Sequence, residues 1–241
     1  MHNWRPGTAQ ALVIVCFLPA LTTTTVRAQQ PDAAAVIRGI DAAVHARFDS
    51  IAEFTVTEHY AVFRGKDATK PMAEMTVKTL YKRDEGKSYT ILSQSGPDIV
   101  KKMAFSSLLD NEKRINDPVT REASWFISAN YEMKLRPGGP QLLDGRECFV
   151  LDITPKHKAP NLIVGTMWVD AKDESLVQIQ GMASKSPSIW AGPTQMMRQY
   201  VNIHGFAMAT HARAESSSFL FGQTVVTIDY SDYQIKLRSA K

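Results

Sequence analysis

Residues 165–183, GTMWVDAKDESLVQIQGMA, contain the pattern that recurs through most of this chain. Two runs of strand-forming residues, 166–169 and 176–180, flank the polar connection 170–174. This arrangement predicts two antiparallel strands joined by a short turn. The turn carries three acidic residues, but such clusters are usually solvated, and the following positions lack the regularly spaced oxygen ligands of a calcium loop. We therefore expect a structural hairpin that carries no chemistry.

The same alternation of apolar and polar residues predicts strands through most of the chain. Before the hairpin this alternation is clear at 54–62, 75–81 and 89–91, which we expect to form a meander. It is also clear at 131–135, where one face of the strand is apolar and the other is polar and faces solvent. Strands become denser beyond residue 146, and their turns are spaced near ten residues apart, which indicates an antiparallel sheet in sequential order. We place these later strands at 147–154, 162–170, 176–182, 195–204, 206–217 and 223–235.

Only two segments have a helical period. Residues 32–49 repeat apolar side chains at helical spacing, and Asp32 can cap the start of this helix. A second helical segment begins at Pro97, continues to about residue 111 and ends by Pro118. A sheet of about ten strands curls, and so few helices cannot cover both of its faces. The expected fold class is therefore mainly β (α+β): a curved antiparallel sheet that forms an incomplete barrel, covered by an N-terminal helix and a central helical segment.

The N-terminal residues 1–28 have the features of a signal peptide. A basic residue precedes an apolar run at 11–21, and small residues precede a cleavage site that we place after Ala28. The run is too short to span a bilayer, although a retained anchor is the alternative. Cys16 lies inside the run after Val15, where a lipidation site needs a small residue, so we expect no lipid anchor. Residues 29–241 then form a single domain of a periplasmic or otherwise exported protein with no membrane span.

Charge and cysteine content exclude several classes of partner and site. The signal segment holds two of the 28 basic residues and no acidic residue, which leaves 26 basic against 24 acidic residues. This balance argues against a nucleic-acid partner. Cys148 is the only cysteine after residue 28, so neither an internal disulfide nor a cysteine metal cluster can form there. We expect Cys148 to be a buried thiol.

No catalytic motif is present. The sequence lacks a nucleophile elbow, a zinc-protease helix and a phosphate-binding glycine loop, and Ser95 in QSGP lacks the first glycine of an elbow. His204 and His211 could form half of a metal site, but zinc needs three or four ligands. We expect no catalytic residue, no metal and no cofactor, and hence a protein that is not an enzyme. An exported hydrolase that uses Ser95, His204 or His211 is the weaker alternative.

The strands instead offer apolar and aromatic side chains, including methionines, which adapt to variable apolar ligands. We expect those that share a strand face with other apolar residues to line a hydrophobic concavity, with contact to the helices alone as the alternative. These candidates are Phe54, Val56, Tyr60, Met75, Val77, Tyr81, Tyr89, Ile91, Tyr131, Met133 and Leu135.

Several segments follow one another in a recognisable order: 89–91 leading into 96–110, 129–135 (ANYEMKL), 144–151 (DGRECFVL), 167–170 (MWVD), 200–206 (YVNIHGF) and 227–233 (TIDYSDY). In this order of elements the chain resembles the LolA-like outer-membrane lipoprotein-sorting proteins, over nearly all of 29–241. The resemblance implies an incomplete barrel with a helical lid over an apolar cavity, which in the carrier takes up lipoprotein acyl chains in the periplasm. The segment around Trp125 departs from the carrier's pattern, and the carrier's cavity arginine has no position that we can assign.

This resemblance favours a non-catalytic carrier or binding protein for lipoprotein acyl chains, lipid or another hydrophobic ligand, with a role in lipoprotein sorting and outer-membrane biogenesis. The alternative is a cell-envelope sensor or scaffold module of the same fold, whose concavity receives a partner protein. Both depend on a hollow between helices and sheet.

Overall fold

The computed structural model describes residues 1, 31–65, 68–186, 192–218 and 222–239. Apart from Met1, the predicted signal peptide with Cys16 and its cleavage site lies outside the described residues. None of the helices in the described ranges combines the length and the apolar character needed to cross a membrane.

The first helix, α1 (Ala33–Ser50), matches the prediction for 32–49. The Asp32 carboxylate accepts a hydrogen bond of 3.0 Å from the amide of Ala34 and so caps the helix. Its buried residues Val36, Ile40 and Val44 recur every four positions and form one apolar stripe. The helix therefore packs through one face and leaves the other to solvent.

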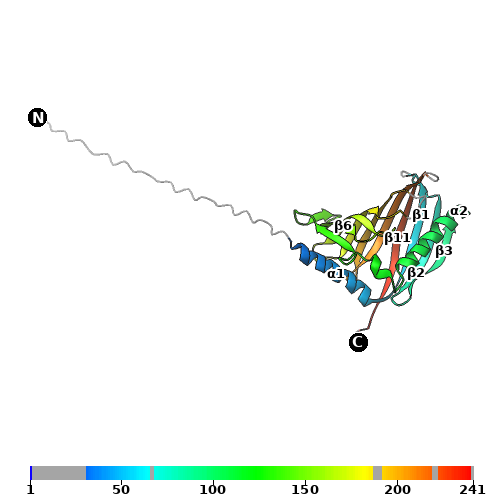
Figure 1. Ribbon diagram of the computed structural model, residues 1–241, viewed down its shortest axis with the longest axis horizontal. Coiled ribbons are helices and arrows are strands. Elements are labelled where there is room, and N and C mark those ends of the chain that lie inside the picture. The colour runs from blue at the N-terminus through cyan, green and yellow to red at the C-terminus, as the bar shows by residue number, and fades with distance from the viewer. Residues whose placement is uncertain (2–30, 66–67, 187–191, 219–221, 240–241) are drawn as a thin grey trace.

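Within the described residues, eleven strands form one antiparallel sheet. It curves around the helices, as Figure 1 shows, and its order is β3-β2-β1-β11-β10-β9-β8-β7-β6-β4, with β5 paired to β6. Because β3 and β4 stand at opposite ends of this order, the sheet is the predicted incomplete barrel. The strands are β1 (Ile51–Arg64), β2 (Ala73–Lys82), β3 (Gly86–Ser95), β4 (Tyr131–Leu135), β5 (Gln141–Leu143), β6 (Arg146–Pro155), β7 (Ile163–Asp170), β8 (Leu176–Ala183), β9 (Thr194–Ile203), β10 (Phe206–Ser218) and β11 (Gly222–Leu237).

The sequential order predicted for the sheet holds only in part. Two runs, β1 to β3 and β6 to β11, are sequential, but the first strand also pairs with the last along most of its length, from Ile51 opposite Leu237 to Arg64 opposite Thr224. This pairing removes the free edges that two separate meanders would leave at β1 and β11. It also places residues near the two ends of the chain on one concave surface.

The central helical segment begins after Pro97, as predicted, but it is not one regular helix. It consists of α2 (Asp98–Val100), a π-helical turn η1 (Lys101–Phe105) and α3 (Ser106–Ile115). Phe105, at the end of the π turn, is fully buried. A short 3-10 helix, η2 (Arg121–Ser124), follows Pro118.

Hydrophobic clusters lie beneath each helical cover. In Figure 1, α1 lies beside β6, and the segment from α2 to α3 lies over β1 to β3. The cluster under α1 joins it to β4, β6, β7 and β8, whereas the cluster under α3 joins Phe105 to β1, β2 and β11. A third cluster, which includes Phe54 and Tyr81, occupies the far end of β1 and β2. The concave face is thus covered in two parts.

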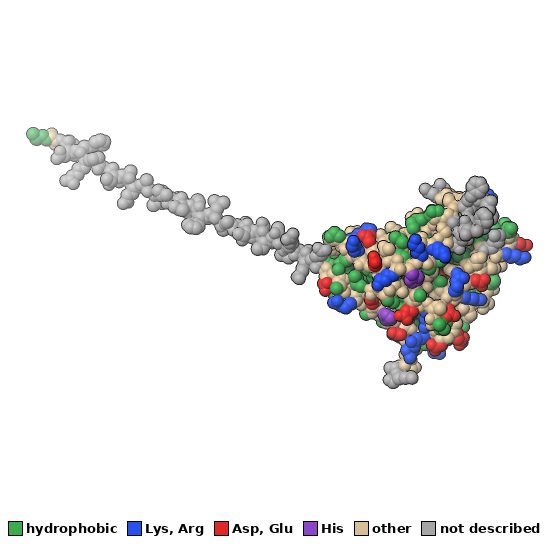
Figure 2. All heavy atoms as spheres, in the orientation of Figure 1, with side chains coloured by type: hydrophobic (Ala, Val, Ile, Leu, Met, Phe, Trp, Pro, Cys, Tyr) green, Lys and Arg blue, Asp and Glu red, His purple; other side chains and the backbone are tan. Residues whose placement is uncertain are grey.

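The outer surface carries both signs of charge. On the face shown in Figure 2, basic and acidic side chains are interspersed among the hydrophobic and uncharged ones. This distribution agrees with the near balance of charge in the sequence.

Candidate functional site

A cavity of about 150 Å³ lies between α1, α3 and the concave face of the sheet. Its lining comes from both helical covers and from strands β1, β3, β8, β9, β10 and β11, so it lies where the two covers meet. Apolar and charged side chains share this lining. The described residues that form it are Ala43, Val44, Arg47, Phe48, Phe54, Val56, Glu58, Lys87, Glu112, Ile115, Asn116, Ser124, Trp125, Phe126, Ser175, Leu176, Arg198, Tyr200, Gly205, Ala207, Ala209, Tyr230 and Tyr233.

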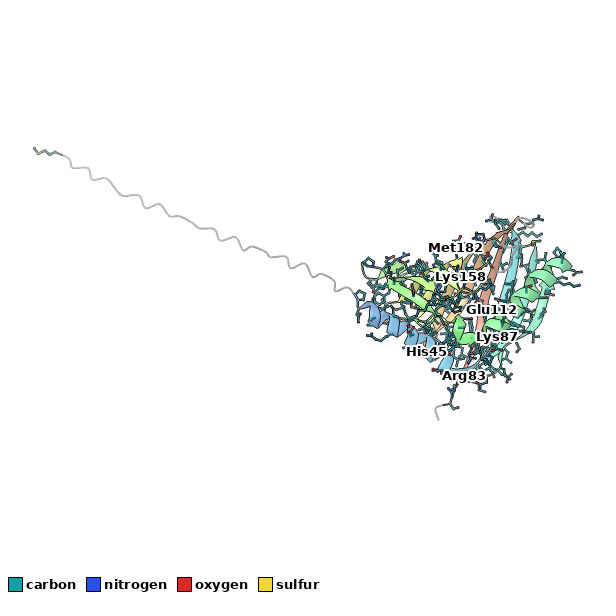
Figure 3. The ribbon with its side chains drawn as sticks, viewed as in Figure 1. His45, Arg83, Lys87, Glu112, Lys158 and Met182 are labelled. Carbon is teal, nitrogen blue, oxygen red and sulfur yellow. The ribbon has the colours of Figure 1, made fainter. Side chains whose placement is uncertain are left out.

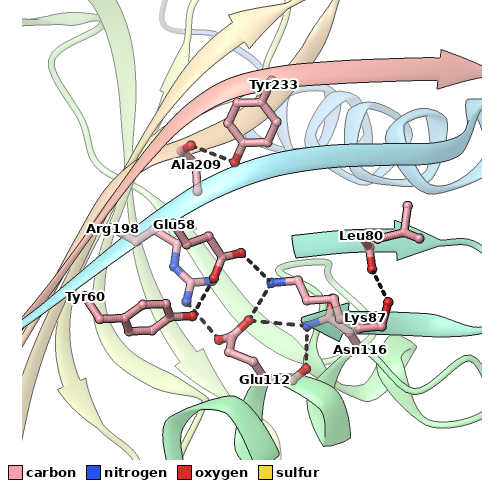
Figure 4. Close-up of polar contacts among 10 residues, drawn as sticks. Glu58, Tyr60, Leu80, Lys87, Glu112, Asn116, Arg198, Ala209 and Tyr233 are labelled. Carbon is pink, nitrogen blue, oxygen red and sulfur yellow. Dashed lines mark hydrogen bonds and ion pairs between the residues drawn. The ribbon is translucent and has the colours of Figure 1, made fainter. Parts of the chain in front are cut away.

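A carboxylate stands on the inward face of β1. The alternation of this strand points Phe54, Val56, Glu58 and Tyr60 to the same side, and the Glu58 side chain is 1% exposed. The Tyr60 hydroxyl donates a hydrogen bond of 2.5 Å to Glu58 Oε2, as Figure 4 shows. The other oxygen, Oε1, has no hydrogen bond and lies 3.7 Å from the ammonium nitrogen of Lys87. Glu58 is therefore a buried carboxyl group that lies within ion-pair distance of Lys87.

Lys87 also connects the sheet to the helical cover. Its Nζ donates to Glu112 Oε2 on α3 at 2.7 Å, and both side chains are about one-tenth exposed (10% and 11%). Asn116 Nδ2 donates to the backbone carbonyl of Glu112 at 2.8 Å, and Arg198 Nη2 on β9 lies 3.8 Å from Glu112 Oε1. Figure 3 shows Lys87 and Glu112 next to each other. These contacts tie α3 to β3 and β9.

The surrounding charges keep this pair ionised. Burial alone would raise the pKa of the Glu112 carboxyl, but the charges of Lys87 and Arg198 outweigh it and hold that pKa below its ordinary value. Burial would likewise lower the pKa of Lys87, yet the carboxylates of Glu112 and Glu58 raise that pKa well above its ordinary value. The pair is ionised throughout the neutral pH range.

Tyrosines supply uncharged polar groups to the same region. Burial raises the pKa of Tyr60, Tyr230 and Tyr233, so their phenols stay protonated at neutral pH. The Tyr233 hydroxyl donates to the backbone carbonyl of Ala209 at 2.9 Å (Figure 4). The cavity is consequently rich in hydroxyl groups as well as in charges.

Arg47 brings a cation into the cavity from α1. It follows Val44 by three positions and therefore faces the sheet with the apolar stripe. Its Nε is buried without a hydrogen-bond partner, and its Cζ lies 4.7 Å from the centre of the Phe48 ring. Burial lowers the pKa of this guanidinium, and the like charge of Arg198 lowers it further. Among the described residues, Arg47 has no carboxylate partner.

Two stacked aromatic rings stand between the cavity and a second pocket. Phe48 and Trp125 stack with their centroids 4.0 Å apart and an interplanar angle of 11°. Both also line a second, outer pocket of about 220 Å³ beside Arg83 and Arg121. The indole Nε1 of Trp125 is buried without a hydrogen-bond partner. The stacked pair therefore forms the partition between the inner cavity and the outer pocket.

The residues predicted to line a hydrophobic concavity occupy several places. Phe54 and Val56 line the cavity, while Tyr60 belongs to the polar network beside it. Met75, Val77 and Tyr89 pack in or against the cluster under α3, and Tyr81 packs with Phe54 in the third cluster. Tyr131 lies in the cluster under α1, with Met133 and Leu135 against it. Ile91 is 52% exposed on edge strand β3.

Sequence reasoning missed the charged residues of the cavity, although a signal was present. Glu58 interrupts the apolar register between Val56 and Tyr60, and Lys87 precedes Tyr89 by two positions. A charge in a run of otherwise inward apolar positions indicates a buried polar network rather than a solvated face. Arg47 gives the same signal on the helix, because it is a charged residue at a position that the helical spacing of Ile40 and Val44 places on the inward face.

None of the residues considered for catalysis is among the described residues that line the cavity, although His204 directly precedes Gly205, which does. His211 Nδ1 lies 2.6 Å from Asp229 Oδ1 across β10 and β11, His204 occupies the turn between β9 and β10, and Ser95 ends β3. The described part of the chain contains no group of three or more His, Cys, Asp or Glu residues able to hold a metal ion. Cys148 is fully buried on β6, as expected.

Comparison with known proteins gives matches at the level of structure. No protein-family model matches the sequence, and no curated protein matches it. Among solved structures, a LolA superfamily protein from Nitrosomonas europaea is 15% identical, with a TM-score of 0.44 and coverage of 88% of this chain and 96% of that one. An outer membrane lipoprotein-sorting protein domain from Vibrio parahaemolyticus is 12% identical, with a TM-score of 0.44 and coverage of 82% and 91%. A DUF1329 family protein from Desulfovibrio piger is 15% identical, with a TM-score of 0.40 and coverage of 83% and 93%.

Proposed function

We propose that this chain is an exported, periplasmic carrier or binding protein that takes a lipid, or the acyl chains of a lipoprotein, between its helices and the concave face of its sheet. The observation that carries the proposal is the cavity left where the two helical covers meet. The side chains of α1 and α3 do not fill the whole space inside the curved sheet, although protein interiors are usually close-packed. The space that remains is available to a ligand.

The size of the cavity sets a condition on binding. Pockets for small molecules are usually about 300–1,000 Å³. The cavity of about 150 Å³ admits only the end of a long ligand in the conformation described. Uptake of a whole acyl chain therefore requires one helical cover to move away from the sheet.

We infer that the segment from α2 to α3, rather than α1, is the cover that moves. At the cavity it meets the sheet through the Lys87–Glu112 ion pair rather than through continuous apolar packing. A buried ion pair contributes little net stability, because desolvation offsets most of the attraction. The π-helical turn η1 interrupts the regular hydrogen bonding of this segment, and such turns are frequent at functional sites.

Hydrophobic transfer is sufficient to drive uptake without a catalytic group. Each buried methylene gains about 0.8 kcal/mol, so one long acyl chain gains on the order of 10 kcal/mol on leaving water. Opening the cover exposes apolar surface of the protein, and the bound chain then shields that surface from water.

Binding of fluorescent alkyl probes of increasing chain length tests this function. Affinity should rise about fourfold with each added methylene until the tail fills the opened space. Ala43→Phe places a large ring in the cavity from α1 and should weaken binding, whereas Ala42→Phe places the same ring on the exposed face of that helix and should not. Affinity that is independent of chain length, or equal in both variants, would contradict the proposal.

Native mass spectrometry of protein purified from the cell envelope is an independent test. Retained lipid or lipoprotein supports the carrier. A stoichiometric protein partner without any lipid would favour the sensor or scaffold alternative instead.

A further inference from the structure

The charges that line the cavity do not balance. Among its described lining residues, Arg47, Lys87 and Arg198 are basic, whereas Glu58 and Glu112 are acidic. Lys87 hydrogen bonds to Glu112 at 2.7 Å and lies 3.7 Å from Glu58, so it is shared by both carboxylates. One positive charge remains without a counter-ion inside the protein.

Arg47 is the basic residue of the described cavity lining that lacks a counter-ion. It has no carboxylate partner among the described residues, and its buried Nε makes no hydrogen bond. Arg198 is incompletely paired as well, because its Nη2 is 3.8 Å from Glu112 Oε1, beyond hydrogen-bond distance. Arg47 is partly buried and Arg198 is 31% exposed, so water reaches part of both side chains, but the Nε of Arg47 is shielded from it. An unpartnered cation that is partly removed from water is costly, and an anionic ligand would lower that cost.

The groups around these arginines suit the head of an amphiphile. Tyr230 lines the same cavity with a protonated phenol that can donate a hydrogen bond. Phe48, Phe54 and Trp125 line it with apolar rings, along which an alkyl chain can lie. Guanidinium groups bind carboxylate and phosphate oxygens with two parallel hydrogen bonds.

We propose that Arg47, with Arg198 and Tyr230, binds the monoanionic head group of an amphiphilic ligand, a carboxylate or a phosphodiester, inside the cavity. This inference rests on the carrier function proposed above and specifies its ligand. The single excess charge matches a monoanion, and the head group lies inward while the alkyl chain runs past Phe48 and Trp125. Glu58 and Glu112 repel a second negative charge and so disfavour a phosphate monoester.

Matched ligands of one chain length test the assignment. Dodecanoate carries a carboxylate, lauroyl lysophosphatidylglycerol carries a phosphodiester, and dodecanol carries no charge. At least one of the two anions should bind about tenfold more tightly than dodecanol. The tighter anion identifies the head-group chemistry, and equal affinity for all three ligands would overturn the proposal.

Substitutions separate the charge from packing. Arg47→Met keeps the length of the side chain, and it should abolish the preference for the anion while leaving dodecanol affinity unchanged. Arg38→Met, at an exposed arginine of the same helix with 71% of its side chain accessible, should change neither. An equal loss of affinity for dodecanol in Arg47→Met would show that Arg47 acts through packing and would overturn the proposal.

The result also separates this inference from the carrier function. If dodecanol and the anions bind equally well, the carrier stands and the head-group site falls. If none of them binds to folded wild-type protein, both proposals fall. The thermal midpoint of Arg47→Met should equal or exceed that of wild type, because the substitution removes an uncompensated charge.

Discussion

The ammonium nitrogen of Lys87 on β3 lies 2.7 Å from Oε2 of Glu112 on α3, and this contact joins an edge of the sheet to the helical cover. Both side chains are nearly buried, so the bond is formed largely out of water. Its strength therefore depends on both partners being present and charged. The same contact contributes to the free-energy cost of separating α3 from the sheet.

Glu112→Leu should destabilise the protein by about 3–5 kcal/mol, because it leaves the Lys87 charge buried with only Glu58 nearby, at 3.7 Å. The double variant Lys87→Met with Glu112→Leu should recover much of this loss. Urea unfolding followed by circular dichroism measures both. Lys82→Met provides the control, since it breaks an exposed ion pair with Glu85 at 3.0 Å and should cost less than about 1 kcal/mol. Equal effects of Glu112→Leu and Lys82→Met would contradict the structure.

The contribution of Glu112 to stability should depend on pH in one direction. Its pKa in the folded protein is below the ordinary value of 4.5, so the unfolded chain binds its proton first as the pH falls. The stabilisation is therefore complete above about pH 5 and is lost as the pH falls through the lower, folded pKa. The destabilisation caused by Glu112→Gln should be largest near neutral pH and shrink toward pH 3. A difference between wild type and Glu112→Gln that stays constant across this range would rule out the ionised pair.

The contribution of Lys87 to stability depends on pH in the opposite direction, because it is lost as the pH rises. The pKa of Lys87 is raised well above 10.5 in the folded protein, so its contribution is complete below about pH 10. It is lost only as the pH rises through that raised value. The ion pair should thus hold the helical cover across the whole physiological pH range.

Local patterns in the sequence were sufficient for the elements but not for their pairing. The helix at 32–49 and the later strands could be placed to within about two residues, because their apolar periods of 3.6 and 2 are undisturbed. The pairing of β1 with β11 joins residues such as His59 and Asp229 across most of the chain, and no local pattern encodes it. The short strand β5 was missed because its three residues are too few to show a period.

The site was harder to predict for a physical reason. An apolar concavity could be expected from a curved sheet with few helices, but the central polar network could not be placed without the three-dimensional contacts. Glu58, Lys87 and Arg198 lie on three different strands, and only the curl of the sheet brings them toward Glu112. Charges that interrupt an apolar register were the only available signal.

The Cys148 thiol should be unreactive in the folded protein. It is fully buried on β6, and burial raises its pKa, so the nucleophilic thiolate is scarce as well as inaccessible. Modification by a maleimide, read as mass added to the Cys148 peptide, should be at least about a thousandfold slower in buffer than in urea. Rapid native labelling of that peptide would show that β6 opens locally, contrary to its buried position.

The Phe48–Trp125 stack should control how fast a ligand enters, because both rings border the cavity on one side and the outer pocket on the other. Trp125→Ala opens this partition, and stopped-flow mixing with a fluorescent alkyl probe should show association and dissociation both faster by about tenfold, with a smaller change in equilibrium affinity. Trp168→Phe alters a tryptophan on β7 that is not among the cavity-lining residues and should leave both rates unchanged. Phe48→Leu should give an intermediate result, since it removes the stacking at 4.0 Å but keeps an apolar side chain in place. If Trp125→Ala instead lowers affinity with no change in association rate, the indole contacts the bound chain and does not limit entry.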